Sequence, residues 1–533
     1  MIFPEEIWKY ILCHLDKDNL KRCLLVSNEF RELIIKTPEL MRKLPVIFFN
    51  ESWKTKLSFI EQYGVFVRSI KFDDCGFKSI KDVRNILIQT PNVETLIFYN
   101  CYILEAQEIH NEERGFNAIL GNAYGFDGFV VNNENNNNEE ENHHEVSNEI
   151  DSARNSSDSE EEDPLDLLKL TFLHLDSCNI AKKVVQNLRT CTTLKTFKIT
   201  FYYQSPVNYF TNFICQQDSL EELHCVGWSD MVFKSLFKNN ISSDRIKFKL
   251  KKFCLECELG YHENFSKFLR SQAGNLKELD LTCYNINFHY YRLIFNSFKN
   301  LTSLTLPTDW FLTDDRVNDI KDCKIPSLKE LELIGANDDV ASFKTVVEIF
   351  PNIEVLRAEN LMYFSLKDIL ENFSNLRHLK AENFRIETML FVNLPSLKIV
   401  EISYLFPMAM SFLWENFAQS CPNIEKLIIK DIGHFKLNAS IKKEIGLIIK
   451  NLVNFKELKY CEIICSLQEP MVNADEDQQD AHQFYEHPFY KIIIENFSDD
   501  EKVIKVSQYF AQHCLEYVNV LKDIFANCDI IEV

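Results

Sequence analysis

Glycine and proline are scarce in this sequence, with 12 glycines and 14 prolines in 533 residues. That excludes a collagen-like or low-complexity chain. Uninterrupted apolar runs of about 18 residues, the length that a membrane span needs, are also missing. The glycine-rich turns G-x-G-x-x-G and G-x-x-x-x-G-K do not occur, which disfavours a dinucleotide-binding or P-loop fold.

Positive charge is in deficit. Lysine and arginine number 58 against 79 aspartates and glutamates, so the formal net charge is −21. A nucleic-acid-binding protein normally carries a basic face, and anionic membrane surfaces attract basic segments. We therefore expect neither nucleic acid nor membrane as a partner, although 58 basic residues leave room for a local basic patch.

The N-terminus carries no basic segment of the kind that opens a secretory signal peptide. We therefore expect a cytoplasmic or nuclear protein, or one present in both compartments. In these compartments thiols stay reduced, and the odd count of 17 cysteines fits free thiols better than a disulfide framework.

Motifs that carry catalytic or metal chemistry are hard to find. Cys254 and Cys257 form a lone C-x-x-C, whereas a zinc site needs a second pair of ligands. The His143-His144 pair lies in an acidic stretch, where a solvated tail is the alternative to a weak metal site. No G-x-S-x-G or H-E-x-x-H occurs. The sequence predicts no enzyme, no cofactor and no metal.

A repeated apolar pattern, L-x-x-L-x-L with conservative replacements, runs through most of the chain. Its copies start 21 to 31 residues apart in most cases, and include Val67-x-x-Ile70-x-Phe72, Val93-x-x-Leu96-x-Phe98, Leu170-x-x-Leu173-x-Leu175, Leu276-x-x-Leu279-x-Leu281, Leu328-x-x-Leu331-x-Leu333 and Ile424-x-x-Leu427-x-Ile429. Each copy predicts a short strand with its leucines turned inward, and each interval has room for a helix.

This pattern resembles the leucine-rich repeat family over about residues 60–500. The resemblance implies an α/β solenoid shaped like a horseshoe, with the strands on its concave side. Three early copies end in the cysteine that the family's cysteine-type repeat carries, Cys75, Cys101 and Cys178. The alternative, recurrent strands in another α/β fold, lacks the glycine-rich turns noted above.

The expected organisation is therefore a small all-α segment followed by the repeats. Residues 132–163 hold twelve acidic residues and one arginine, and predict a disordered insertion. We expect Ser498 to begin one or two helices that close the array. The predicted parts are residues 1–45, the first repeats at 46–131, the insertion at 132–163, further repeats at 164–497 with an acidic loop at about 468–483, and a cap at 498–533.

The first 35 residues predict three short helices. Pro4 suits a helix start, Ile7, Ile11 and Leu15 share one helix face, and Asp16 and Ser27 are candidate N-caps for the second and third helices. Three helices of this length expose more apolar surface than they bury, so another protein surface is expected to cover them.

The same stretch resembles an F-box over residues 2–40. The matching positions are Phe3-Pro4, Glu6-Ile7, Ile11-Leu12, Leu15-Asp16, Asp18-x-Leu20, Val26-Ser27 and Phe30-Arg31. Phe3 and Phe30 stand where the family usually has leucine and tryptophan. An F-box followed by leucine-rich repeats is the order found in F-box/leucine-rich-repeat proteins.

That resemblance implies the substrate-recognition subunit of an SCF-type cullin–RING ubiquitin ligase. The F-box binds the SCF adaptor, and through it the cullin–RING, while the repeats bind a protein substrate; the alternative is a binding scaffold without a ligase role. Family position puts a set of residues at or under the adaptor interface, although some of them could hold the helices together instead: Pro4, Ile7, Ile11, Leu12, Leu15, Leu20, Leu24, Val26 and Phe30.

Positions that alternate with the buried leucines should face outward on the predicted strands. They predict a substrate surface, acidic at its middle and basic toward its end, whose alternative is a solvated charged face. Its residues are Glu278, Asp280, Glu330, Glu332, Arg357, His378, Lys380, Lys426 and Lys430. The basic end would suit an acidic or phosphorylated motif.

Two serines in the acidic insertion are candidate phosphorylation sites. Ser157 and Ser159 each precede a glutamate by three residues, Glu160 and Glu162, as acid-directed kinases require. The alternative is an acidic linker that needs no modification.

Overall fold

The computed structural model divides the chain into two compact units, unit 1 (Met1–Ser219) and unit 2 (Leu220–Val533). It describes residues 4–50, 54–103, 167–179, 181–201, 208–227, 246–257, 259–283, 286–307, 320, 323–334, 346, 348–358, 369, 372–382, 393–403, 411–430, 438–466, 489–498, 501–507, 511, 515–524 and 528–532. The predicted insertion at 132–163, with His143, His144, Ser157 and Ser159, and the acidic loop at 468–483 lie outside these residues.

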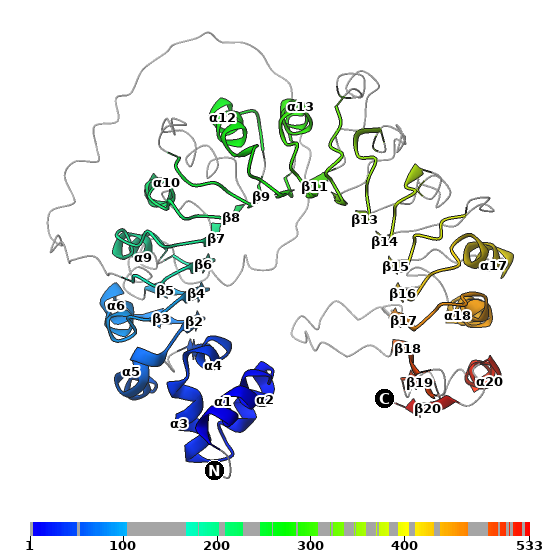
Figure 1. Ribbon diagram of the computed structural model, residues 1–533, viewed down its shortest axis with the longest axis horizontal. Helices are drawn as coiled ribbons and strands as arrows, with labels where there is room; N and C mark the ends of the chain where they lie inside the picture. Colours follow the sequence, from blue (N-terminus) through cyan, green and yellow to red (C-terminus); the bar gives the residue numbers. More distant parts are fainter. Residues whose placement is uncertain are drawn as a thin grey trace, which may run out of the picture. The chain divides into compact units, whose positions relative to one another are not determined.

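Unit 1 begins with four helices and continues as a parallel sheet (Figure 1). Its helices are α1 (Glu5–Cys13), α2 (Lys17–Cys23), α3 (Asn28–Lys36), α4 (Pro38–Lys43), α5 (Leu57–Tyr63), α6 (Ile80–Gln89), α9 (Ala181–Asn187) and α10 (Asn208–Cys215), with a 3₁₀ turn, η2 (Gly64–Phe66). Its strands are β1 (Val46–Phe49), β2 (Ser69–Asp73), β4 (Thr95–Tyr99), β6 (Phe172–Asp176) and β7 (Thr196–Phe201), with the short pair β3 (Gly76–Phe77) and β5 (Tyr102–Ile103).

The strands of unit 1 pair in parallel in the order β1, β2, β4, β6, β7. The register aligns the repeated apolar positions: Phe48 lies opposite Phe72, and Phe72 opposite Phe98. All three rings are fully buried, whereas the alternate residues of these strands stay partly exposed. Helices α5, α6, α9 and α10 cover the face on which these apolar residues lie (Figure 1).

Unit 2 continues the same pattern. Its strands are β8 (Glu222–Gly227), β9 (Lys252–Glu256), β10 (Glu278–Leu281), β11 (Ser303–Pro307), β12 (Glu330–Ile334), β13 (Val355–Ala358), β14 (His378–Glu382), β15 (Ile399–Ser403), β16 (Lys426–Lys430), β17 (Tyr460–Ser466), β18 (Phe489–Ser498), β19 (Glu501–Val506) and β20 (Cys528–Glu532). Its helices are α12 (Glu263–Gln272), α13 (Phe288–Ser297), α17 (Ser411–Ser420), α18 (Asn438–Asn451) and α20 (Leu515–Ile524), with a 3₁₀ turn, η6 (Leu452–Asn454).

Strands β8 to β17 pair in parallel, each with the next along the chain. The strands predicted at the L-x-x-L-x-L copies are confirmed, and their leucines are buried: Leu279 and Leu281 in β10, and Leu331 and Leu333 in β12. The prediction of an α/β protein is thus confirmed as a mixed fold with a long parallel sheet.

The C-terminal tail differs from its prediction. Ser498 ends β18 instead of capping a helix, so the predicted helix start there is wrong. Strands β18 and β19 extend the sheet in antiparallel pairing, and β20 pairs parallel to β19. The reason lies in residues 503–506, where buried Ile504 and Val506 alternate with half-buried residues, a period of two that suits a strand. The helix of the tail begins at Leu515.

Helix α4 is a fourth helix in a segment for which three were predicted. Pro38 occupies its first turn, where the missing N–H of proline costs nothing, and Glu39 follows it. Leu40 and Leu44 then join the apolar cluster of the other helices. The predicted caps of α2 and α3 are confirmed, since Asp16 accepts a hydrogen bond from the Asn19 amide at 2.8 Å and Ser27 one from the Phe30 amide at 3.2 Å.

Candidate functional site

The helices α1 to α4 enclose a small apolar core. Six side chains are buried in it, and further ones pack against its rim. Trp8 on α1 meets Phe30 on α3 edge to face, with 4.8 Å between ring centroids. The Lys43 ammonium donates to the carbonyls of Cys13 and Leu15 at 2.6 and 3.1 Å, which ties α4 to the end of α1.

The residues predicted at or under an adaptor interface fall into three groups in this segment. Leu12 and Leu20 are buried, so they hold the helices together and would support a partner only from below. Leu15, Leu24 and Phe30 are half-buried against the core. The exposed members, which a partner contacts without any rearrangement, are Pro4, Ile7, Ile11 and Val26.

Two more exposed apolar residues were not in the predicted set. Tyr10 and Leu25 are 68% and 81% exposed, and Val26 beside Leu25 is 67% exposed. Ile7, Tyr10 and Ile11 lie at i, i+3 and i+4 and so form one stripe on α1. The available signal was the pair Leu24-Leu25: consecutive residues of a helical segment point in different directions, so only one of them can face the core.

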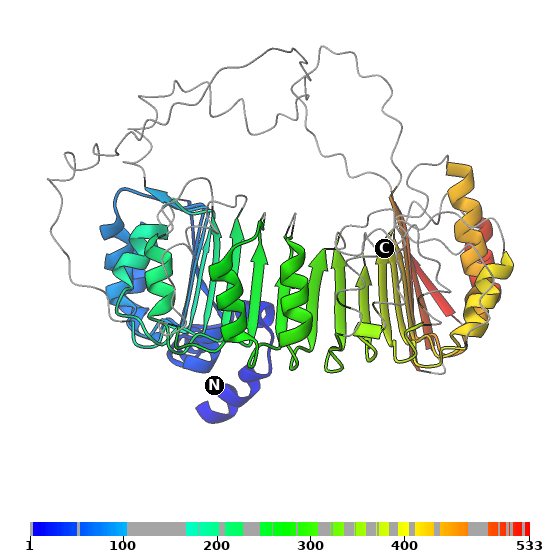
Figure 2. The same cartoon turned by 90° about the horizontal axis from the view of Figure 1, so that it is seen from above.

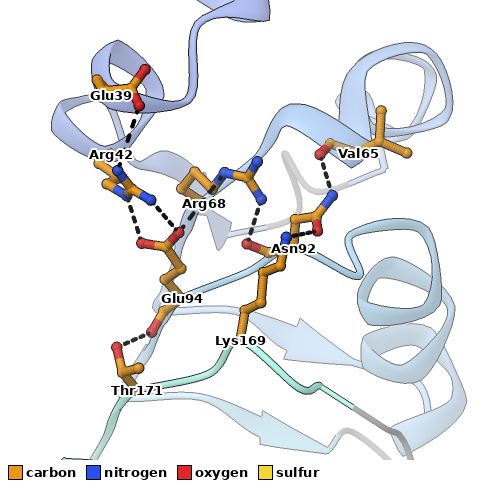
Figure 3. A network of polar contacts seen from close by, with 8 residues as sticks. All are labelled: Glu39, Arg42, Val65, Arg68, Asn92, Glu94, Lys169 and Thr171. Atoms are coloured by element: carbon orange, nitrogen blue, oxygen red, sulfur yellow. Dashed lines mark hydrogen bonds and ion pairs between the residues drawn. The ribbon is translucent and has the colours of Figure 1, made fainter.

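The F-box helices are joined to the sheet of unit 1 by a polar network (Figure 3). Arg42 on α4 makes a bidentate contact with the Glu94 carboxylate, at 2.7 Å from Nε and 2.9 Å from Nη2. Glu94 immediately precedes β4, and its second cation is the mostly buried Arg68, whose Nε is 4.0 Å away. Arg68 also donates to the carbonyl of Asn92 at 3.0 Å. Glu94 therefore couples α4 to two neighbouring repeats.

This coupling predicts a pH dependence. Hydrogen bonds from Arg42 hold the pKa of Glu94 below its ordinary value. A carboxyl whose pKa is lowered by folding contributes stability that is present above its unfolded pKa, about 4.3, and is lost as pH falls through the folded pKa. Arg42→Met should lower the free energy of unfolding at neutral pH by about 0.5–1 kcal/mol, because half of Arg42 is exposed to solvent.

The difference between wild type and Arg42→Met should shrink as pH falls below about 4. Urea unfolding at neutral and acidic pH measures it. Arg292→Met removes an exposed arginine from α13, which takes part in no ion pair within the described residues, and serves as the control. Equal pH profiles for the two variants would contradict the role of the Arg42–Glu94 pair.

The predicted substrate residues all lie in unit 2, on the sheet face opposite the buried leucines. The register places Glu278 and Glu330 in one row with His378 and Lys426. Asp280, Glu332, Arg357 and Lys380 form the next row, and Lys430 follows at the end of β16. The strands thus bring these side chains to one surface.

Charge on this face is more balanced than the sequence prediction of an acidic middle and a basic end. Arg357 lies 3.5 Å from Glu330, and Lys426 lies 3.8 Å from Glu401. Burial lowers the pKa of His378, so this histidine is neutral at physiological pH. Glu401 was missed, although its place between Val400 and Ile402 gives it the same outward parity as Lys380.

Membrane and metal sites were searched within the described ranges. No helix there combines the length and the apolar character needed to cross a bilayer. No group of three or more histidine, cysteine or acidic side chains gathers there in a way that would hold a metal ion.

Comparison with known proteins assigns only the N-terminal segment. In a search of curated proteins, no protein matches this chain at a significant level. Residues 2–40 match the family model described as "F-box domain". The match covers α1, α2, α3 and the start of α4, which carry the exposed apolar residues described above. Residues 2–40 of this chain are an F-box domain.

Proposed function

We propose that the chain is the substrate-recognition subunit of an SCF-type ubiquitin ligase. The observation that carries the proposal is the F-box domain, because F-box domains bind the SCF adaptor and through it the cullin–RING. The exposed side chains Ile7, Tyr10, Ile11, Leu25 and Val26 supply apolar surface for that contact. A cluster of exposed large apolar residues commonly marks a protein-binding surface.

The parallel strands are proposed to be leucine-rich repeats that bind the substrate. Support comes from the strand at each repeated motif and from the cysteines at the ends of early copies. The Cys75 thiol donates to the carbonyl of Phe48 in the preceding strand, and the Cys101 amide donates to the Cys178 sulfur, both at 3.4 Å. Cysteines in this place link neighbouring turns, as the cysteine-type repeat requires. The horseshoe and the predicted domain limits belong to the same proposal.

Catalysis is assigned to other subunits. F-box proteins are generally non-catalytic receptors, so the proposed task of this chain is to bring a protein substrate to the ligase in the cytoplasm or nucleus. Phosphorylation of Ser157 and Ser159 remains a prediction. The second candidate function is a scaffold that binds proteins through its repeats but recruits no ligase.

Assembly with purified components separates the two functions. The full chain, the SCF adaptor and the cullin–RING subunit are mixed and passed over a size-exclusion column. A substrate receptor should elute with the adaptor and the cullin in one peak, and the cullin should join only when the adaptor is present. Elution of the full chain apart from the adaptor would support the scaffold and contradict the proposed function.

A further inference from the structure

One edge of the unit 2 sheet carries a row of charged side chains. Because the strands are parallel and in register, the residues that immediately precede them lie along the edge where the strands begin (Figure 2). Their backbones are linked in sequence: the amides of Arg377 and His378 donate to the carbonyl of Glu354 at 2.8 and 3.0 Å. We call the six residues that precede β12 to β17 the strand-start row: Lys329, Glu354, Arg377, Lys398, Glu425 and Lys459.

Each carboxylate in the strand-start row lies between two cations. Glu354 is 2.7 Å from the Lys329 ammonium and 3.6 Å from the Arg377 guanidinium. Glu425 is 2.6 Å from Lys398 and 2.8 Å from Lys459. Hydrogen bonds from the lysines lower the pKa of Glu354 and lower that of Glu425 to about 2, so both stay ionised at physiological pH. Four cations and two carboxylates leave the row with two positive charges.

The two central cations have their carboxylates on opposite sides. Arg377 and Lys398 precede the neighbouring strands β14 and β15, and they are 66% and 55% exposed. Glu354 pairs with Arg377 from the β13 side, and Glu425 pairs with Lys398 from the β16 side. The space between Arg377 and Lys398 therefore has a cation on each side and no carboxylate of the row within it.

The outward face of the same sheet offers no comparable surplus. There Arg357 pairs with Glu330, Lys426 pairs with Glu401, and His378 is neutral. The strand-start row also differs from the chain as a whole, whose net charge is −21. An anionic partner is repelled by most of this protein and attracted to this edge, which favours one binding position over others.

We propose that the strand-start row binds an acidic segment of a protein, with an acidic side chain held between Arg377 and Lys398. Arginine binds carboxylates through two parallel hydrogen bonds, which gives the contact a defined geometry. Six neighbouring strands span about 24 Å, and an extended peptide of about seven residues covers that length. The inference rests on the proposed function, because it names the class of substrate that the receptor would take.

Fluorescence anisotropy with the full chain tests this proposal. The probe is a labelled peptide that alternates glutamate with serine, and its neutral counterpart alternates glutamine with serine. The acidic probe should bind and the neutral one should not, and binding should weaken as salt rises, because exposed charges are screened. Arg377→Glu with Lys398→Glu should weaken binding by at least about tenfold, because two attractions become repulsions.

A matched control makes the same charge change elsewhere. Lys183→Glu with Lys522→Glu reverses two exposed lysines on α9 and α20 and should leave the affinity within about twofold, because these lysines are not on the row. Equal losses in both double variants would show a general charge effect and overturn the proposal. Absence of binding by the acidic probe, or tighter binding of a duplex DNA of similar length, would overturn it as well.

Failure of this inference is distinguishable from failure of the proposed function. The Arg377→Glu, Lys398→Glu variant should bind the SCF adaptor as wild type does, because its substitutions leave the F-box helices unchanged. If the acidic probe binds at the strand-start row but the adaptor does not bind at all, the receptor function fails while the acidic-segment site stands.

Discussion

Replacing Ile11 and Val26 by aspartate is expected to abolish adaptor binding by the full chain, with a loss in affinity of at least about hundredfold, or about 2.7 kcal/mol. Both side chains are exposed in the free protein, Val26 to 67%, so a charge at either position costs little folding free energy. At an apolar interface the same charge loses its hydration without gaining a partner, which is strongly unfavourable. Isothermal titration calorimetry with the purified adaptor measures the change.

The control uses the same two residue types in another part of unit 1. Ile88 on α6 and Val65 in η2 are 55% and 50% exposed, so Ile88→Asp with Val65→Asp repeats the chemistry outside the F-box. This variant should keep the wild-type affinity, and circular dichroism should show equal folding of all three proteins. Wild-type affinity in the Ile11→Asp, Val26→Asp variant would exclude these side chains from the interface.

Replacing Phe72 by alanine is expected to destabilise the sheet of unit 1 by about 3–5 kcal/mol. Phe72 is fully buried and stacks between Phe48 and Phe98, with ring centroids 5.0 and 4.8 Å away. Phe77 meets its ring edge to face at 5.4 Å. Truncation leaves a cavity at the centre of this cluster and removes aromatic contacts beyond the burial of area. The cluster spans β1, β2 and β4, so the loss should spread to all three strands.

Hydrogen exchange measured by mass spectrometry reports the local free energy of opening and so tests this second prediction. Amides in β2 and β4 should exchange faster in Phe72→Ala than in wild type. Phe49→Ala removes the same group from β1, but Phe49 is 51% exposed, so the rates should change little. Similar rates in the two variants would show that the stacked rings do not stabilise this sheet.

Much of the fold is predictable because the sequence repeats its physical pattern. Leu279 and Leu281, or Leu331 and Leu333, alternate with charged residues in each copy, and such alternation selects a strand with one buried face. The F-box helices are predictable for another reason: Asp16 and Ser27 are good N-caps placed just before apolar helical runs. Local chemistry and the apolar pattern agree at these positions, so the sequence indicates a single answer.

The remaining features depend on contacts between distant residues. Whether Ile11 or Leu12 faces solvent is set by how α1 packs on α3 and α4, and the sequence places both at matching F-box positions. Glu401 balances the basic residues of the outward face only because β15 lies between β14 and β16. The helix expected at Ser498 was wrong because the acidic residues after it resemble a helix start, while the apolar period just beyond belongs to β19.

Hydrogen exchange of the full chain with and without the SCF adaptor tests the central claim most directly. The adaptor should slow exchange in peptides from α1, α2 and the turn at Leu25 and Val26, where the exposed apolar residues lie. Exchange in β9 to β16 should stay unchanged, because substrate binding is assigned there. Unchanged exchange across residues 4–40, with or without protection in unit 2, would contradict the account.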